Sequence, residues 1–153
     1  MTVTVIRALT VRQPWAHLIA RGGKTVENRT RRTHWRGPVL IHAAKTLPVA
    51  QWARARGRFG QSAVPEREAL PLGAVVAVAD LTECHGSGWP WRCNSGACAR
   101  WGDHGPETWH WVLANVRPLL DPIPARGQLG LWTPANELAA AVATALPAKE
   151  DQR

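Results

Sequence analysis

Short β-branched runs bounded by glycine or proline restrict the fold of this chain more than any other feature. They predict strands over residues 3–11, 25–29, 38–44, 72–83, 109–116, 117–123 and 128–132. Helices are expected over 14–23, over 48–60 and in an Ala-rich tail from residue 134, and residues 84–108 are expected to be irregular. Because strands and helices do not alternate regularly, this order favours a small, partly open β-barrel with helices packed on it over a doubly wound sheet.

The length and composition of the chain limit its organisation. Its 153 residues, 45% of them hydrophobic, supply enough apolar material for one core. We expect one domain over residues 1–133, followed by the Ala-rich helix and a charged tail over 134–153. No apolar run approaches the roughly 18 residues of a membrane span, and the first residues lack a charged leader and a cleavage site. A cytoplasmic protein without a membrane partner is therefore expected.

Positive charge is concentrated in the first half of the chain. Residues 1–58 contain twelve Lys or Arg against one acid, Glu27, whereas residues 59–153 contain seven against ten. This asymmetry is typical of proteins that bind phosphate backbones, because each cation that meets a phosphate releases condensed counterions. The alternative is a genome that prefers Arg on ordinary solvated surfaces.

Side chains that suit a nucleotide flank the first expected helix, in the stretch LTVRQPWAHLIARGGKTVENRT. Trp15 offers a flat face for stacking, and Arg12 and Gln13 offer hydrogen-bonding groups for a base edge. Lys24 offers a compact cation. Each has a structural alternative, since Trp15 can belong to the core and Lys24 can complement the dipole at the end of the helix.

The next two expected strands extend this set of residues. Thr25, Glu27 and Arg29 share one face of the first strand, and His42 and Lys45 lie at the end of the second, within reach of the same cleft. The structural alternatives are an ion pair that joins Glu27 to Arg29 or to Arg12, and a His42 that is partly buried and hydrogen-bonded.

The loop between these two strands, RTRRTHWRG, combines cations with an aromatic ring. Arg31 and Trp35 are expected to contact nucleic acid there, because splayed bases stack on aromatic rings while Arg and Lys hold the backbone. Single-stranded or modified RNA suits this mixture.

Four segments together, in this order, resemble the ASCH domain family: LTVRQPWAHLIARGGKTVENRT, RGPVLIHAAK, GAVVAVADL and WHWVLANVRPLLDPIPARGQLGLW. The resemblance spans about residues 7–132. It implies an α+β fold built on a PUA-like β-barrel, mixed and largely antiparallel, and roles connected with RNA. Some small members are described as ribonucleases, and one branch comprises amidohydrolases that act on N4-acetylcytidine, so the fold alone does not select a function.

The amidohydrolase pattern transfers to this sequence only in part. In that branch catalysis is attributed to a lysine in a GxKT-like turn, a threonine three residues later and a distant glutamate. Lys24 matches the lysine, but Glu27 stands where the threonine is expected, and no distant glutamate aligns. Thr25 can substitute as the nucleophile, or Glu27 can activate water while Lys24 stabilises the oxyanion. We expect the carboxylate of Glu27 to raise the pKa of Lys24, which would make this lysine a poor base.

Besides amide hydrolysis, the sequence allows three other functions, two of which would use the same cleft. A metal-independent ribonuclease needs a base, an acid and a cation, which His42, Glu27 and either Lys24 or Lys45 can supply. A binding module needs recognition groups only, and these residues resemble recognition groups more than a matched acid and base. We therefore favour binding of RNA or of a modified nucleoside, with hydrolysis as the alternative and a protein-interaction adaptor as a third class. None of these activities requires a cofactor.

The irregular segment contains the three cysteines of the chain. Cys84, Cys93 and Cys98, together with His104, can supply three thiolates and one imidazole to a structural zinc ion. The alternatives are free or buried thiols and a lid over the cleft, because the spacing is looser than that of usual zinc sites and the loop is long.

Overall fold

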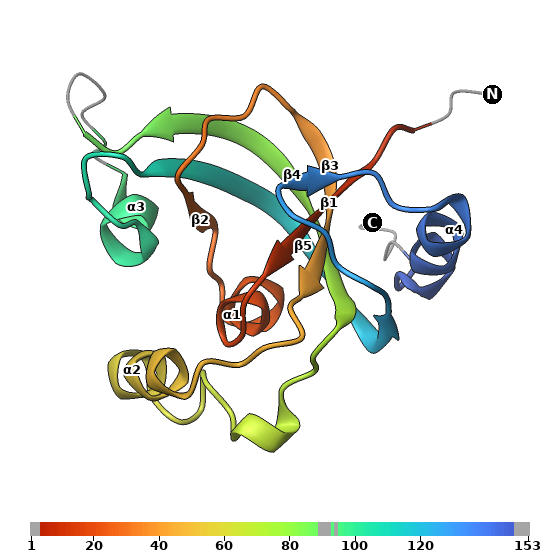
Figure 1. Cartoon of the computed structure of the whole chain (residues 1–153), viewed down its shortest axis with the longest axis horizontal. Helices are drawn as coiled ribbons and strands as arrows, with labels where there is room; N and C mark the ends of the chain where they lie inside the picture. Colours follow the sequence, from red (N-terminus) through yellow and green to blue (C-terminus); the bar gives the residue numbers. More distant parts are fainter. Residues whose placement is uncertain (1–3, 89–92, 94, 149–153) are drawn as a thin grey trace, which may run out of the picture.

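A computed structural model of the chain describes residues 4–88, 93 and 95–148 (Figure 1). The strands are β1 (Arg7–Val11), β2 (Val26–Arg29), β3 (Gly37–Ala43), β4 (Ala74–Gly86), β5 (Trp109–Pro124) and β6 (Leu131–Trp132). The helices are α1 (Trp15–Arg21), α2 (Val49–Phe59), α3 (Gly96–Trp101) and α4 (Asn136–Ala145), with a short 3-10 helix, η1 (Arg67–Ala69).

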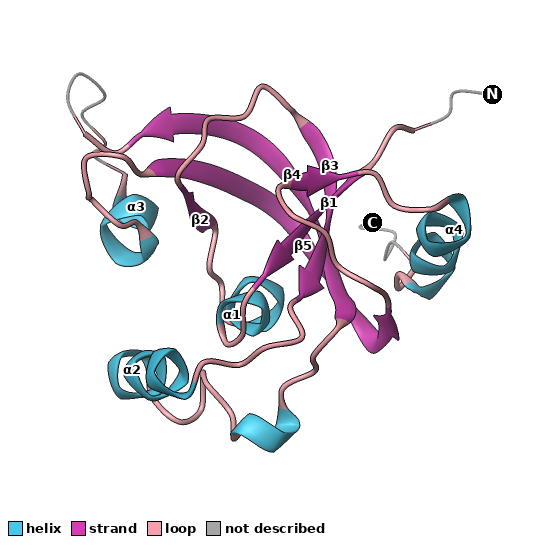
Figure 2. Cartoon of the chain, in the orientation of Figure 1, coloured by secondary structure: helices cyan, strands magenta, loops and turns pink. Residues whose placement is uncertain are grey.

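The strands form one curled sheet in the order β2-β5-β4-β3-β1-β6. Strands β1 and β3 run parallel, and the other neighbouring pairs run antiparallel. Because β2 and β6 are both edge strands, the sheet is a half-barrel with helices around it (Figure 2). The expected α+β fold, a small, partly open and largely antiparallel barrel carrying helices, is confirmed.

Strand β5 is continuous where two strands were expected. Asn115 adopts a positive φ of 50°, and the register with β4 shifts between Val78 and Asp80, opposite this point. Asparagine tolerates this conformation better than most residues, and an extra residue in one strand bends it without ending it. The chain therefore bends within β5 and continues to pair with β4.

Helix α3 lies inside the segment that was expected to be irregular. Its N-cap is Ser95, whose side chain accepts a hydrogen bond of 3.0 Å from the backbone N–H of Cys98. The helix lies beside β2 at the far end of the β4–β5 hairpin (Figure 1). It contributes the buried side chains of Cys98 and Trp101 to a core that also includes α2 residues.

The two faces of the sheet are buried against different helices. Alternate residues such as Leu9 and Ile41 pack with Ile19 of α1 on one face. Their neighbours on the other face pack with Val142 of α4, which is 1% exposed. The Ala-rich tail helix is thus part of the core, while the domain boundary expected at residue 133 stays a prediction.

None of the helices in the described part of the chain combines the length and the apolar character that a membrane crossing needs.

Candidate functional site

A pocket of about 980 Å³ opens where α1, α2, α3 and β2 approach one another. Its lining contains five cations against two acids, three aromatic rings and one histidine: Arg12, Lys24, Arg29, Arg54, Arg58, Glu27, Asp103, Trp15, Phe59, Trp101 and His104. Five of these residues, Arg12, Trp15, Lys24, Glu27 and Arg29, were expected from the sequence, and the structure brings them together.

Lys24 is directed to the pocket by the turn that ends α1. Gly23 adopts a positive φ of 75°, which glycine accepts without strain, and the Lys24 N–H returns to the carbonyl of Leu18. The Lys24 side chain is only 2% exposed. Its ammonium group donates to the carbonyl of Val26 and lies 5.9 Å from the centre of the Trp15 ring.

Burial lowers the pKa of Lys24 below its usual value. Glu27 acts in the opposite direction but with a smaller effect, and Arg29 lowers the pKa further. Glu27 thus acts on this lysine in the expected direction, but the pKa is lowered overall because desolvation of the ammonium group outweighs the attraction of the carboxylate.

Glu27 and Arg29 each keep a buried polar atom without a partner. One carboxylate oxygen of Glu27 accepts the Asn28 N–H at 3.1 Å, while its Oε2 is buried and unbonded. Arg29 donates from NH2 to the carbonyl of Thr10 at 2.7 Å, and its Nε is buried and unbonded. Among the described residues, no ion pair joins Glu27 to Arg12 or to Arg29. Both side chains line the pocket and thus retain unused hydrogen-bonding capacity beside it.

Two of the cations that line the pocket come from α2, a helix whose basic character is visible in the sequence. Arg54 and Arg58 are exposed on α2, and Arg58 also donates to the carbonyl of Arg100 at 2.8 Å. Sequence reasoning missed their role because only the packing of α2 against α3 turns this face toward β2. The helical spacing of four residues is the signal that could have identified the pair.

Aromatic rings form a second part of the wall. Trp15 meets Phe59 edge to face with centroids 6.3 Å apart, and Phe59 in turn lies 4.7 Å from Trp101. Trp15 is half-buried and packs against the core while it lines the pocket. Trp15 is therefore in part a core residue, and its role as a stacking surface stays a prediction.

Several expected site residues lie elsewhere. Gln13 is fully buried, where its amide donates to the carbonyl of Pro71 at 2.9 Å and accepts from the His17 N–H at 2.9 Å. Thr25 and Lys45 are absent from the described pocket lining. These residues are adjacent to the pocket in sequence, but the packing of α1 and the twist of the strands direct them to other surroundings.

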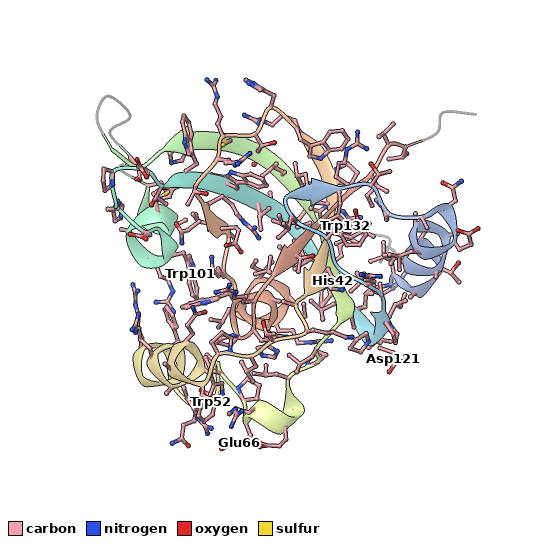
Figure 3. All side chains as sticks on the ribbon, viewed as in Figure 1. His42, Trp52, Glu66, Trp101, Asp121 and Trp132 are labelled. Atoms are coloured by element: carbon pink, nitrogen blue, oxygen red, sulfur yellow. The ribbon has the colours of Figure 1, made fainter. Side chains whose placement is uncertain are left out.

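His42 is a core residue, which agrees with the alternative prediction of a buried and hydrogen-bonded histidine. It is 1% exposed, and its Nε2 lies 2.7 Å from the carbonyl oxygen of Ala125. Its Nδ1 lies 3.3 Å from the hydroxyl of Thr10, and its ring meets Trp132 edge to face. In Figure 3 His42 and Trp132 lie on one side of the sheet, well away from Trp101 at the pocket.

The Arg-rich loop forms a second hollow of about 590 Å³ that shares Arg29 and Gly130 with the main pocket. Arg31 lines this second hollow. Trp35 lies outside both linings, half-buried against the core, with the guanidinium of Arg7 4.8 Å from its ring centre. The two hollows offer an extended cationic surface.

The residues that could hold a metal ion form a different set from the one expected. Cys93 and Cys98 lie together, but their neighbours are His85 and His110. Cys84 points into the core, because side chains alternate along β4, and His104 lines the pocket instead.

A model of the ASCH domain matches residues 9–123, about three quarters of the chain. The chain belongs to the ASCH domain family. This family is generally associated with RNA binding. The matched residues contain every charged and aromatic residue named above for the main pocket, from Arg12 to His104. No curated protein sequence matches the chain.

Crystal structures of an ASCH protein from Zymomonas mobilis share the fold. The crystal structure of the Zymomonas mobilis ASCH protein is 14% identical, covers 93% of the present chain and 96% of its own, and has a TM-score of 0.56. Structures of a Tyr-to-Phe and a Ser-to-Ala variant give TM-scores of 0.55 and 0.53, each at 14% identity. They cover 94% and 93% of the present chain and 100% and 96% of their own. At this identity the likeness supports the ASCH fold and nothing finer.

Proposed function

We propose that this ASCH domain binds single-stranded RNA, or a modified nucleoside, in the pocket between β2 and the helices α1, α2 and α3. One observation carries the proposal: Glu27 and Arg29 line a pocket whose other charged groups are mostly cations, and each keeps one buried polar atom, Oε2 and Nε, without a hydrogen-bond partner. A buried polar atom without a partner costs about 1–3 kcal/mol, so a ligand that bonds to both atoms removes this cost.

The polar groups and aromatic rings of the pocket suit a nucleobase. A carboxylate oxygen accepts a hydrogen bond from an exocyclic amino group or a ring N–H, and the guanidinium of Arg29 donates to a base carbonyl. Trp15, Phe59 and Trp101 supply the aromatic wall. A base that carries both a donor and an acceptor on one edge therefore meets complementary groups.

The rim of the pocket suits the sugar-phosphate backbone. Arg12 and Arg54 are exposed at the pocket, and the adjoining hollow carries Arg31. Guanidinium groups bind phosphate through paired N–H donors. We place this activity in the cytoplasm, where three free cysteines remain reduced.

Fluorescence anisotropy with a labelled single-stranded RNA oligomer tests the proposal. Wild type should bind with an affinity that falls as salt rises, and Lys24→Met should weaken binding by about 10- to 100-fold, the worth of a charged hydrogen bond. Lys45→Met is the matched control, because Lys45 is an exposed lysine outside the pocket. Equal affinity of wild type and Lys24→Met would contradict the proposal.

Hydrolysis of an amide such as that of N4-acetylcytidine is the second candidate. It is favoured by the lowered pKa of Lys24, which lies beside Glu27. A lysine that loses its proton more readily can act as a base, while Glu27 or Arg29 holds the substrate. The ribonuclease constellation has less support, since His42 lies in the core and Lys45 lies outside the pocket lining.

One incubation separates binding from hydrolysis. The protein is mixed with N4-acetylcytidine and with single-stranded RNA, with and without chelator, and the products are measured by mass spectrometry. Deacetylation or cleavage that disappears in Lys24→Met would establish an enzyme. Intact substrates together with salt-sensitive RNA binding would establish a recognition module.

A further inference from the structure

Four side chains with metal-binding atoms meet outside the pocket, at the end of the β4–β5 hairpin. They are His85 at the end of β4, Cys93 in the following loop, Cys98 in α3 and His110 at the start of β5. One ligand atom from each residue lies within 4.8 Å of those of the other three. Two thiols and two imidazoles from four separate segments thus surround one point.

The register of the hairpin brings the two histidines together. His85 pairs with His110 across β4 and β5, and their ring centroids are 5.3 Å apart. The preceding pair, Cys84 and Trp111, packs into the core on the opposite face. Alternation along the two strands therefore excludes Cys84 from the cluster and includes His85.

Outer hydrogen bonds orient both imidazole rings. Nδ1 of His85 lies 2.8 Å from a carboxylate oxygen of Glu83, so Nδ1–H donates and Nε2 keeps its lone pair. That Nε2 lies 3.0 Å from the sulfur of Cys93 and 3.5 Å from the sulfur of Cys98. A carboxylate behind a histidine is the arrangement that accompanies metal-binding histidines in many proteins.

His110 supplies an independent observation. The residue is 0% exposed, and its Nε2–H donates to the carbonyl oxygen of Asp103 at 2.8 Å. Its Nδ1 therefore carries the lone pair, and this atom is buried with no hydrogen-bond partner. A buried nitrogen with an unused lone pair beside two thiols needs a ligand for that lone pair.

The donor set matches zinc in kind and in size. Tetrahedral zinc takes thiolates at about 2.3 Å and imidazoles at about 2.0–2.1 Å, which places its ligand atoms about 3.3–3.8 Å from one another. The separations from His85 to the two sulfurs, 3.0 and 3.5 Å, need only small adjustments to reach this geometry. Four protein ligands fill the coordination shell, as in structural zinc sites.

We propose that His85, Cys93, Cys98 and His110 bind one zinc ion that fixes α3 and its loop to the β4–β5 hairpin. Binding forms two Zn–S and two Zn–N bonds, and the two thiol protons pass to solvent. No water or substrate position remains on the metal, so the ion is structural.

This site also supports one wall of the pocket. Asp103 is held to His110 through its carbonyl and to Asn28 of β2 through its N–H, which donates to Asn28 Oδ1 at 2.8 Å. A Cβ at Gly102 would lie only 2.5 Å from the carbonyl oxygen of Cys98 and 2.7 Å from the His110 ring. The backbone that carries Trp101 and Asp103 to the pocket thus rests directly on two of the proposed ligands.

Metal analysis of the full chain tests the proposal directly. The protein is produced without a histidine tag, kept reduced, and measured by elemental mass spectrometry for zinc per chain. The metal-free protein is then titrated with Co²⁺ and followed by visible absorption. We expect one zinc per chain, and with cobalt a thiolate charge-transfer band together with the ligand-field bands of a tetrahedral site.

Variants distinguish this ligand set from the alternatives. Cys93→Ser, at a half-buried position, should weaken cobalt affinity by more than 10-fold and reduce the charge-transfer band. Glu83→Gln, at an exposed position, should keep the spectrum but lower the affinity by about 10- to 100-fold, because it loosens the orientation of His85. Cys84→Ala and His104→Gln should retain full metal content, since both residues lie outside the cluster.

Three results would overturn the proposal. The first is wild type that takes up neither zinc nor cobalt in stoichiometric amount under reducing conditions. The second is cobalt uptake without thiolate bands. The third is loss of metal in Cys84→Ala or His104→Gln with full retention in Cys93→Ser. The metal measurements do not involve RNA. Their outcome is therefore independent of whether the proposed RNA binding is correct.

Discussion

Single residues in the pocket are held in states that are unfavourable without a ligand. Lys24 is buried with a lowered pKa, Glu27 keeps a carboxylate oxygen unbonded, and Arg29 keeps an unbonded N–H. Such groups are usually solvated or fully paired. Their retention at one place is consistent with selection for binding, and it makes separate predictions for stability and for affinity.

The pH dependence of stability should change in Lys24→Met. The pKa of Lys24 is lowered in the folded chain from its usual 10.5, so between these two values the unfolded chain binds more protons and the stability from this group rises with pH. Wild type should therefore gain stability relative to Lys24→Met as the pH rises toward 10.5. Urea denaturation at several pH values measures this difference. A difference that stays constant with pH would show that the lysine pKa is not lowered.

Gln13→Ala should reduce stability and leave affinity unchanged. The substitution leaves the carbonyl of Pro71 and the N–H of His17 without partners, at a cost of about 1–3 kcal/mol each at most. The midpoint of urea unfolding should fall, while folded protein binds RNA as wild type does. Gln61→Ala, at an exposed glutamine, is the control for stability. A loss of RNA affinity without a loss of stability would contradict this prediction and show that Gln13 takes part in recognition.

At the scale of elements, α2 and α3 convert a sheet edge into a pocket. Helix α2 brings exposed arginines to one side, and α3 brings Trp101 and Asp103 to the other. Asn28 of β2 joins α3 through a bond of 2.9 Å to the Trp101 carbonyl. The charge of α2 should therefore influence binding without influencing the fold.

Arg54→Gln should lower the salt dependence of RNA binding. Loss of one phosphate contact on a single strand reduces the slope of log K against log salt by about 0.7. Arg56→Gln is the matched control, since Arg56 lies on the same helix but outside the pocket lining, and forms a 2.6 Å ion pair with Glu66. Anisotropy titrations at several salt concentrations measure both slopes. Equal slopes for the two variants would show that Arg54 of α2 does not contact the RNA.

At the scale of the whole molecule, α4 completes the core of the half-barrel. Val142 is 1% exposed and packs with Trp132 and Leu119, and Leu138 covers the same cluster. This helix lies on the face of the sheet opposite α1 (Figure 1). The pocket and α4 therefore occupy separate parts of the molecule, and changes in α4 should affect stability alone.

Val142→Ala should destabilise the chain by about 1–2 kcal/mol, the cost of removing buried methyl groups and leaving a small cavity. Truncation after residue 133 should cost more, because it exposes the whole cluster around Trp132. Thr144→Ala, at an exposed position of α4, should change stability little. Urea denaturation measures all three. A truncated chain as stable as wild type would show that residues 134–153 form a dispensable appendage.

Local sequence patterns determined most of the strands and the helices α1, α2 and α4, because β-branched runs, glycine stops and apolar periodicity act over a few residues. They also determined the half of the pocket that is contiguous in sequence, namely Arg12, Trp15, Lys24, Glu27 and Arg29. The alternation of side chains along a strand placed Glu27 and Arg29 on one face correctly.

Only the tertiary structure decided the rest, because burial and long-range pairing depend on contacts between distant segments. Packing made His42 and Gln13 core residues and lowered the pKa of Lys24, although each suited a functional role in sequence. The register of β4 against β5 selected His85 and His110 over Cys84 and His104 for the metal cluster. A shift of one residue in that register would exchange the two faces of a strand, and no pattern within a single segment fixes it.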